Sequence, residues 1–355
     1  MKEFCKRYPE ICERFDRFWE GADTDRPVLF ISAPREDPDR SVASPELADP
    51  TERVLPEKMV ESARYRLAHT AYHGEGYPHS FVNFGPGILH GCIGGEADFS
   101  STATTWFPKF LSDIEEFTSL QFQPQGKWWS RIMACTNALL DELGEEVVVA
   151  ITDIGGVADI LASAVGTEEL LLDVIERPEA VKAAVDHCHK LWMEAYEINY
   201  ATIAKKQDVS TPWWPVVSRG RTYMTQSDFN SMISPKAFSD LFVGQLGATF
   251  DALDHGCFHL DGIGTEGHVR ALVAQKGLKC IQWVPAPSTS PLDHAKMLRE
   301  IQEAGVAITF MITPEEVERC CKEFDARRLM LNVECESAQQ AEQLIEDTLR
   351  WCEKR

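Results

Sequence analysis

The chain lacks any apolar run as long as the ~20 residues that a membrane-spanning helix requires. The segment from Met1 to Glu20 is charged and follows a helical pattern, without the apolar core of a secretory signal. The 11 cysteines are scattered: no CxxC pair occurs, and the neighbours Cys320 and Cys321 have poor geometry for a disulfide. These absences predict a reduced, soluble protein of the cytoplasm.

Positive charge is scarce as well, because 35 basic residues stand against 56 acidic ones and the formal net charge is −21. Proteins that bind nucleic acids or anionic membranes need clustered Lys and Arg side chains. We therefore expect a small-molecule substrate, no nucleic-acid partner and no membrane partner. A homodimer is compatible with this composition.

Common nucleotide-binding and hydrolase motifs are missing. The turn from Phe84 to Gly87 superficially resembles a nucleotide-binding loop, but positions 85, 87 and 90 are Gly, Gly and His, so the GxGxxG spacing fails. P-loop and serine-hydrolase signatures are absent too. These absences argue against a nucleotide site and against a serine nucleophile.

The sequence does contain a regular alternation of short apolar runs and longer helical patterns. Each run is continuously apolar, which is typical of parallel strands buried on both faces. The eight expected strands are Val28–Ser32, Phe81–Gly85, Val147–Asp153, Val209–Trp213, Cys257–Asp261, Lys279–Val284, Ala307–Ile312 and Leu329–Cys335. Eight such strands separated by helices favour a (β/α)8 TIM barrel over an open doubly wound sheet. We expect one domain over residues 1–355, with a helical cap over 1–25.

Proline and capping residues mark the expected helix boundaries. A helical stretch from Thr167 to about Lys205 should break near Arg177-Pro178, because proline restricts the residue before it. Ser234 and Thr313 each precede a proline and are expected to cap helices. The spacing of apolar residues also predicts a helix over Pro56–Tyr72.

Three further segments fit the barrel. The amphipathic stretch Glu3–Trp19 would cover the amino-terminal end of the barrel. The segments Glu36–Leu55 and Gly85–Asp113 each follow the carboxyl end of a strand. Active sites of such barrels lie at that end, and loops this long in a compact domain are usually functional. We expect both to be lids over the mouth.

The strand end Cys257–Gly262 is the most informative stretch. His259 and Asp261 are two residues apart, so on a strand both side chains leave the same face. A polar pair at the end of a barrel strand, before a glycine turn, is typical of reacting groups. The structural alternative is that His259 is a hydrogen-bonded core histidine and that Asp261 caps the following helix.

These residues could bind a metal ion. His259, Asp261 and Cys335 offer one nitrogen, one oxygen and one sulfur atom, which would fill three positions of an open catalytic zinc site. The open position could bind and deprotonate a thiol or water. Alternatively, Cys335 is a buried apolar cysteine at a strand end.

Metal-free acid–base catalysis is the other chemical hypothesis. Asp153 and Asp261, with His259, could exchange protons near neutral pH if burial shifts their pKa values. Asp153 could instead cap the Gly155-Gly156 turn. The residues expected to contact substrate are Asn83, Trp213, Trp214, Tyr223, Gln226, Asp228, Gln282 and Trp283. The tryptophans suggest a flat or cationic ligand, although core packing explains at least one of them, and Asp228 could be a simple helix cap.

With the strands in place, the chain from about Arg26 onward resembles the uroporphyrinogen decarboxylase superfamily. The residues that carry the resemblance are Arg26-Pro-Val28, Asp153–Leu161, Ala164–Glu169 with Arg177-Pro-Glu179, Ser234–Phe238, the His259 strand, and the last strand and helix. The superfamily is a (β/α)8 barrel that includes corrinoid-linked methyltransferases. Its methyltransferase branch binds zinc through His-x-Cys at the fifth strand and a further Cys at the eighth. His259 and Cys335 match that pattern, and Asp261 stands where the middle thiolate would be.

The resemblance therefore implies a zinc-assisted methyltransferase that moves a methyl group between a small substrate and a corrinoid. The DxHxxG pattern of a corrinoid-binding module is missing, so the corrinoid would arrive on a partner protein. The alternative is a metal-independent decarboxylase or lyase that uses Asp153, His259 and Asp261. The decarboxylase branch holds its tetra-acidic porphyrinogen with an arginine-rich loop, whereas only Arg26 and Arg35 lie near that loop here. A third hypothesis is a small-molecule binding protein that kept the barrel and lost the chemistry.

Overall fold

The computed structural model describes residues 2–101, 104–262 and 264–353, and it shows an α/β protein with a mainly parallel sheet. Seven strands are hydrogen-bonded in the order β2-β1-β9-β8-β7-β6-β5. All neighbouring pairs are parallel except β1 with β2. The strands are β1 (Val28–Pro34), β2 (Thr70–Gly74), β5 (Thr222–Gln226), β6 (His255–Asp261), β7 (Leu278–Val284), β8 (Ala307–Ile312) and β9 (Leu329–Glu334). A second, parallel pair consists of β3 (His79–Phe81) and β4 (Val148–Ala150).

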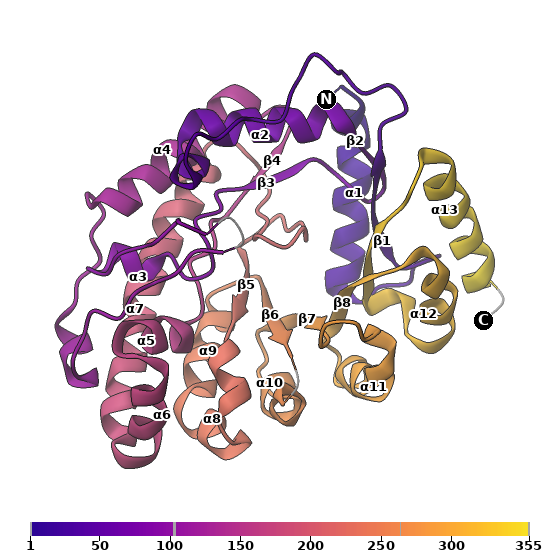
Figure 1. Ribbon diagram of the computed structural model, residues 1–355. Coiled ribbons are helices and arrows are strands. Elements are labelled where there is room, and N and C mark those ends of the chain that lie inside the picture. Colours follow the sequence, from indigo (N-terminus) through magenta and orange to yellow (C-terminus); the bar gives the residue numbers. More distant parts are fainter. Residues whose placement is uncertain (1, 102–103, 263, 354–355) are drawn as a thin grey trace.

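Helices surround the strands (Figure 1). They are α1 (Lys2–Glu20), α2 (Pro56–His69), α3 (Leu89–Cys92), α4 (Lys127–Leu143), α5 (Val157–Val165), α6 (Thr167–Glu176), α7 (Pro178–Ile203), α8 (Pro235–Leu241), α9 (Val243–Asp251), α10 (Val269–Val273), α11 (Ala295–Glu303), α12 (Val317–Glu323) and α13 (Ala338–Glu353). In the part of the chain that the structure describes, no helix is both long and apolar enough to cross a membrane.

Most residues of β1, β6, β7, β8 and β9 are buried on both faces, which explains their apolar runs. Successive side chains of a strand point to opposite sides, so each strand serves two cores. An inner core contains Met224 of β5, Cys257 of β6, Cys280 of β7 and Met330 of β9. The other core lies between the strands and the surrounding helices, and includes residues such as Ile281. This division decides which strand residues can share a site.

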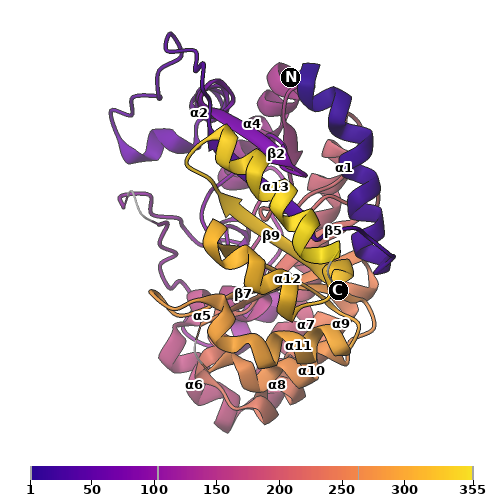
Figure 2. The same cartoon turned by 90° about the vertical axis from the view of Figure 1, so that its right-hand side faces the viewer.

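Helix α1 packs against the sheet at the amino-terminal end of β6, and its role as the cap of a barrel stays a prediction. Phe15 belongs to the inner core, and the Trp19 ring stacks on His255, the first residue of β6, at 4.6 Å between centroids. Figure 2 shows α1 on one side of the molecule and the loops that precede α2 and α4 projecting on the opposite side. These loops belong to the two predicted lid segments, and a lid function for them stays a prediction.

Most predicted strands are confirmed, but not all. The predicted strand Phe81–Gly85 shares only Phe81 with β3, and Val147–Asp153 is a strand only over Val148–Ala150. The strand Ala307–Ile312 has the predicted bounds, and β1, β6, β7 and β9 differ from theirs by a few residues. The prediction for Val209–Trp213 is wrong: this segment forms only an isolated antiparallel bridge, between Ser210 and Ser218. Pro212 lacks an amide hydrogen, which limits ladder pairing there. The fourth strand of the predicted alternation is instead β5, which begins nine residues after this segment, at Thr222.

The helix boundaries agree well with the capping signals. One helix ends at Glu176 and the next begins at Pro178, so the predicted break is confirmed. The Ser234 side chain accepts a hydrogen bond from the Ala237 amide at 3.2 Å, as an N-cap should. Thr313 differs, because its hydroxyl donates to Glu316 and makes no cap bond. The helix predicted over Pro56–Tyr72 is confirmed as far as His69, after which the chain enters β2.

Candidate metal and acid–base site

The site begins with three strand residues that lie side by side. The strand register pairs Gln226 of β5 with His259 of β6, and His259 with Gln282 of β7. Each lies two residues after an inner-core residue, namely Met224, Cys257 and Cys280. Because side chains two apart share a face, all three point to the inner side of the sheet, near the carboxyl ends of their strands.

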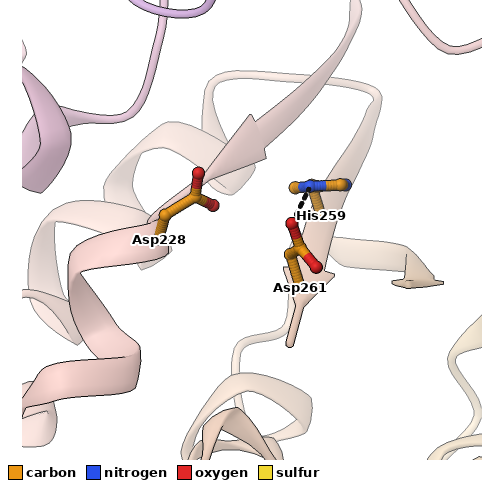
Figure 3. A group of neighbouring side chains, drawn as sticks. All are labelled: Asp228, His259 and Asp261. Carbon is orange, nitrogen blue, oxygen red and sulfur yellow. Dashed lines mark ion pairs between the residues drawn. The ribbon is translucent and has the colours of Figure 1, made fainter. Parts of the chain in front are cut away.

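Asp228, His259 and Asp261 form a group that could hold a metal ion (Figure 3). One ligand atom of each residue lies within 4.8 Å of the others. Asp228 is the first residue of the 3-10 helix η3 (Asp228–Met232), directly beyond β5, and its carboxylate faces His259 across the gap between the two elements. The side chains of His259 and Asp261 are 14% and 41% exposed, so the group is open to solvent.

Gln282 determines which nitrogen of His259 faces the group. The His259 Nδ1 atom lies 2.7 Å from the Gln282 Oε1 atom. An amide oxygen only accepts, so Nδ1 carries the hydrogen and Nε2 faces Asp261, whose Oδ2 atom is 3.7 Å away. A lone pair on Nε2 opposite a carboxylate is repulsive unless a proton or a metal ion lies between them. The arrangement is therefore built to hold a cation.

Without a metal, that cation is a proton. Burial alone would lower the pKa of His259, but hydrogen bonds with Asp261 and Gln282 and the charge of Asp228 outweigh burial and raise it above its usual value. For Asp228, burial raises the pKa, His259 opposes this, and Asp261 adds to it. Both shifts favour the protonated forms of His259 and Asp228.

Asp153 lies at the same end of the sheet, after β4. Its Oδ1 atom accepts a hydrogen bond from the Gly155 amide at 3.0 Å, within the turn, but the N-cap of α5 is Gly156 and Asp153 makes no cap bond to that helix. The same atom lies 3.5 Å from the hydroxyl of Tyr223, which accepts from the Ile154 amide at 2.8 Å. Burial raises the pKa of Asp153 to about 7, with His259 lowering it and Asp228 raising it. Asp153 therefore lies within electrostatic reach of the group.

Asp159 of α5 is a further acid of the site, which sequence reasoning missed. Its Oδ1 atom accepts from the Phe229 amide at 2.8 Å and so ties α5 to the turn that carries Asp228. Its Oδ2 atom is buried and has no hydrogen-bond partner. Burial, followed by the charge of Asp228, raises its pKa to about 7. The available signal was a lone acid in an otherwise apolar helix, VADILASAV.

Cys335, predicted as the third metal ligand, is not part of this group. Met330 of β9 faces the inner core, so Asn332 and Glu334 continue on that face and Cys335 falls on the other. Cys335 is 5% exposed and lies in the core beneath the helices, where burial raises the pKa of its thiol. The structural alternative, a buried apolar cysteine, describes it. Asp228 takes the place of the third ligand.

The predicted aromatic contacts separate into two sets. The Trp213 ring meets the His259 imidazole edge-on, at 5.2 Å between centroids, so it lines the site. Trp214 is buried in the inner core, where its indole donates to Thr309 at 3.2 Å. Trp283 follows Gln282 on the opposite face and packs against His294 beneath the helices. Core packing accounts for the positions of Trp214 and Trp283.

The remaining predicted contacts lie on either side of the group. Gln226 and Tyr223 are buried, and Tyr223 reaches the site only through its hydroxyl, beside Asp153. Asn83 lies beyond β3 and lines a separate cavity of about 290 Å³. The residues lining that cavity include none of Asp228, His259 and Asp261.

Comparison with protein-family models gives no match for this chain. No curated protein matches it either.

Proposed function

We propose that the chain is an enzyme of the uroporphyrinogen decarboxylase type, folded as a (β/α)8 barrel. The observation that supports closure is the position of the pair β3–β4, because these parallel strands precede β5 in the chain and follow β1. The helices lie around the strands on all sides in Figure 1, as the outer helices of a barrel do. Because β2 occupies the second edge of β1, the pair would close the ring between β2 and β5, which would give eight parallel strands and the antiparallel β2.

The function that the site supports best is metal-assisted methyl transfer between a small substrate and a corrinoid carried by a partner protein. The group Asp228–His259–Asp261, open to solvent at the carboxyl ends of the strands, carries this proposal. One imidazole nitrogen and two carboxylates fit zinc and other divalent ions. They do not reproduce the sulfur ligands of the methyltransferase branch, so an oxygen or nitrogen substrate suits this site better than a thiol. A bound divalent ion supplies Lewis acidity to such a substrate atom.

The protein residues would then have distinct tasks. Asp228, His259 and Asp261 hold the ion. Gln282 orients the His259 ring through the hydrogen bond at its Nδ1 atom. Trp213 forms a wall next to His259. Asp153, whose pKa of about 7 leaves part of it neutral, can give a proton to the oxygen or nitrogen atom that loses the methyl group.

Formation of methylcobalamin tests this proposal. The chain, supplied with zinc, would be mixed with chemically reduced cobalamin and methanol, trimethylamine or a methoxylated aromatic acid, and the product followed by absorbance. We expect at least one donor to react, with the rate reduced at least 100-fold in His259→Ala and unchanged in Cys335→Ala. Rates equal to the protein-free reaction with every donor would contradict the proposal.

The second candidate is a metal-independent decarboxylase or lyase that acts on a small carboxylated substrate. The observation in its favour is that a proton alone can occupy the position between His259 and Asp261, while Asp153 titrates near neutral pH. Two such groups can serve as acid and base. The net charge of −21 opposes a multi-carboxylate porphyrinogen. Carbon dioxide release that survives thorough chelation would favour this candidate, and complete loss on chelation would exclude it.

A further inference from the structure

The cavity at Asn83 is a second recess, distinct from the Asp228–His259–Asp261 group. It has a volume of about 290 Å³ and is walled by α2, β3, the turn after β3 and the segment at residues 104–105. Its lining residues are Arg53, Met59, Ser62, Arg66, Ser80, Phe81, Asn83, Gly85, Pro86, Thr104 and Thr105. Two of these are cationic and none is acidic, in a chain whose net charge is −21.

Arg66 of α2 contributes a cation without a counter-ion. Its Nη2 atom donates to the Ser80 hydroxyl at 3.0 Å, and within the described residues it forms no ion pair. Arg64, two residues earlier on the same helix, is paired with Glu142 at 2.8 Å. Arg66 is solvent-exposed and lines the recess, so its guanidinium group is accessible to a ligand. Desolvation by the surrounding protein atoms lowers its pKa, and the Tyr72 phenol opposes the effect.

Arg53 contributes a second cation whose partners are all neutral. It donates to the carbonyl oxygens of Ser101 and Thr104, at 2.6 and 3.1 Å, and to the Thr105 hydroxyl at 2.9 Å. Its guanidinium lies 5.3 Å from the centroid of the Phe99 ring. These contacts fix its position without cancelling its charge.

The other polar group of the recess is also a donor. The Asn83 Oδ1 atom accepts from the Gly85 amide at 2.9 Å, which leaves its side-chain NH2 group available. Gly85, at φ +92°, is needed for the close packing of this wall, because an added Cβ atom would lie 2.4 Å from the Thr105 Cβ atom. The recess therefore presents two guanidinium groups and an amide donor from fixed positions.

We propose that this recess, the Arg53–Arg66 pocket, binds the carboxylate or phosphate group of a small anion. Guanidinium groups present planar pairs of donors that match such oxygen atoms. The two guanidinium groups make the local electrostatic potential positive, although the protein as a whole is acidic. A positive local potential attracts an anion. The pocket lies next to the loop after β4, because the Leu89 amide donates to the Ile154 carbonyl, directly after Asp153. The same anion could thus extend to the reacting groups, a part of this inference that rests on the proposed function.

Isothermal titration calorimetry with succinate and with inorganic phosphate, at low ionic strength and with a chelator present, tests the pocket. We expect the parent chain to bind at least one of the two, and the stronger one distinguishes a carboxylate from a phosphate ligand. Arg66→Gln should weaken binding at least 10-fold, Arg66→Lys less, and Arg64→Gln not at all. Thermal unfolding of each variant shows whether it is folded, and Asn83→Ala gives a second, independent loss.

Two results would overturn the inference. One is the absence of binding heat with both anions in the parent chain. The other is equal affinity in the parent, Arg66→Gln and Asn83→Ala, which would place the ions elsewhere on the surface. Binding should persist in Asp261→Asn, because Asp261 is not among the residues that line the pocket. The anion pocket and the metal site are therefore tested independently: failure of one proposal would not contradict the other.

Discussion

The Nδ1 atom of His259 lies 2.7 Å from the Oε1 atom of Gln282 on the neighbouring strand. The strand register places the two residues side by side, so the contact follows directly from the pairing of β6 with β7. It turns the Nε2 atom of His259 toward Asp261 and Asp228. The use of His259 as a ligand or as an acid therefore depends on Gln282, a residue outside the Asp228–His259–Asp261 group.

Replacement of Gln282 should weaken metal binding. In Gln282→Met the His259 ring loses the acceptor that fixes its tautomer and orientation, and we expect zinc affinity to fall about 10- to 100-fold. Competition with a chromophoric chelator measures it. Gln282→Glu keeps an acceptor at this position and should retain most of the affinity. Equal zinc affinity in Gln282→Met and the parent would remove Gln282 from the site.

The pKa values of the two histidines of β6 should be shifted in opposite directions from the usual value. In the protein from which a chelator has removed any metal, the pKa of His259 is raised, because its partners outweigh burial. Burial lowers the pKa of His255. His259 therefore contributes stability that is complete below its unfolded pKa of about 6.5 and is lost as pH rises through its folded pKa. Titration by NMR should show His259 above His255, and Asp261→Asn should lower the His259 value. The reverse order of the two histidines would contradict this assignment.

Asp153 should make the protein less stable at alkaline pH. Burial raises its pKa to about 7, whereas an unfolded Asp titrates near about 3.9. Its contribution to stability is therefore complete below about pH 4 and is lost as pH rises through about 7. We expect Asp153→Asn to raise the free energy of unfolding at pH 8 by up to about 4 kcal/mol, and much less at pH 5.

Urea unfolding at both pH values measures this difference. Asp240→Asn, an exposed substitution on α8, is the matched control and should change stability little at either pH. A gain from Asp153→Asn that is the same at pH 5 and pH 8 would show that Asp153 is ionised throughout this range in the folded protein.

Much of the fold could be read from the sequence because buried parallel strands are continuously apolar. The strand Ala307–Ile312 was predictable for this reason. Strand β5, with the sequence TYMTQ, was not, because four of its five residues carry polar groups that find partners only in the folded protein. For example, the Thr225 hydroxyl donates to the Cys257 carbonyl on the neighbouring strand.

The site was predictable only within one strand. The spacing of two residues places His259 and Asp261 on one face, and the structure confirms that they lie together. Asp228 reaches them from the next element through strand pairing, which one sequence does not specify, and it could equally have been a helix cap. Cys335 was assigned to the group from its place at a strand end and from the resemblance, but it lies directly after β9 and belongs to the core beneath the helices, whereas Met330 faces the inner core.

The central claim is that Asp228, and not Cys335, completes a metal site with His259 and Asp261. Metal content per chain, measured by mass spectrometry on zinc-supplied protein purified without a metal-affinity tag, tests it most directly. We expect about one zinc per chain in the parent and in Cys335→Ala, and almost none in Asp228→Asn and His259→Ala. No metal in the parent, or loss in Cys335→Ala with retention in Asp228→Asn, would contradict the claim.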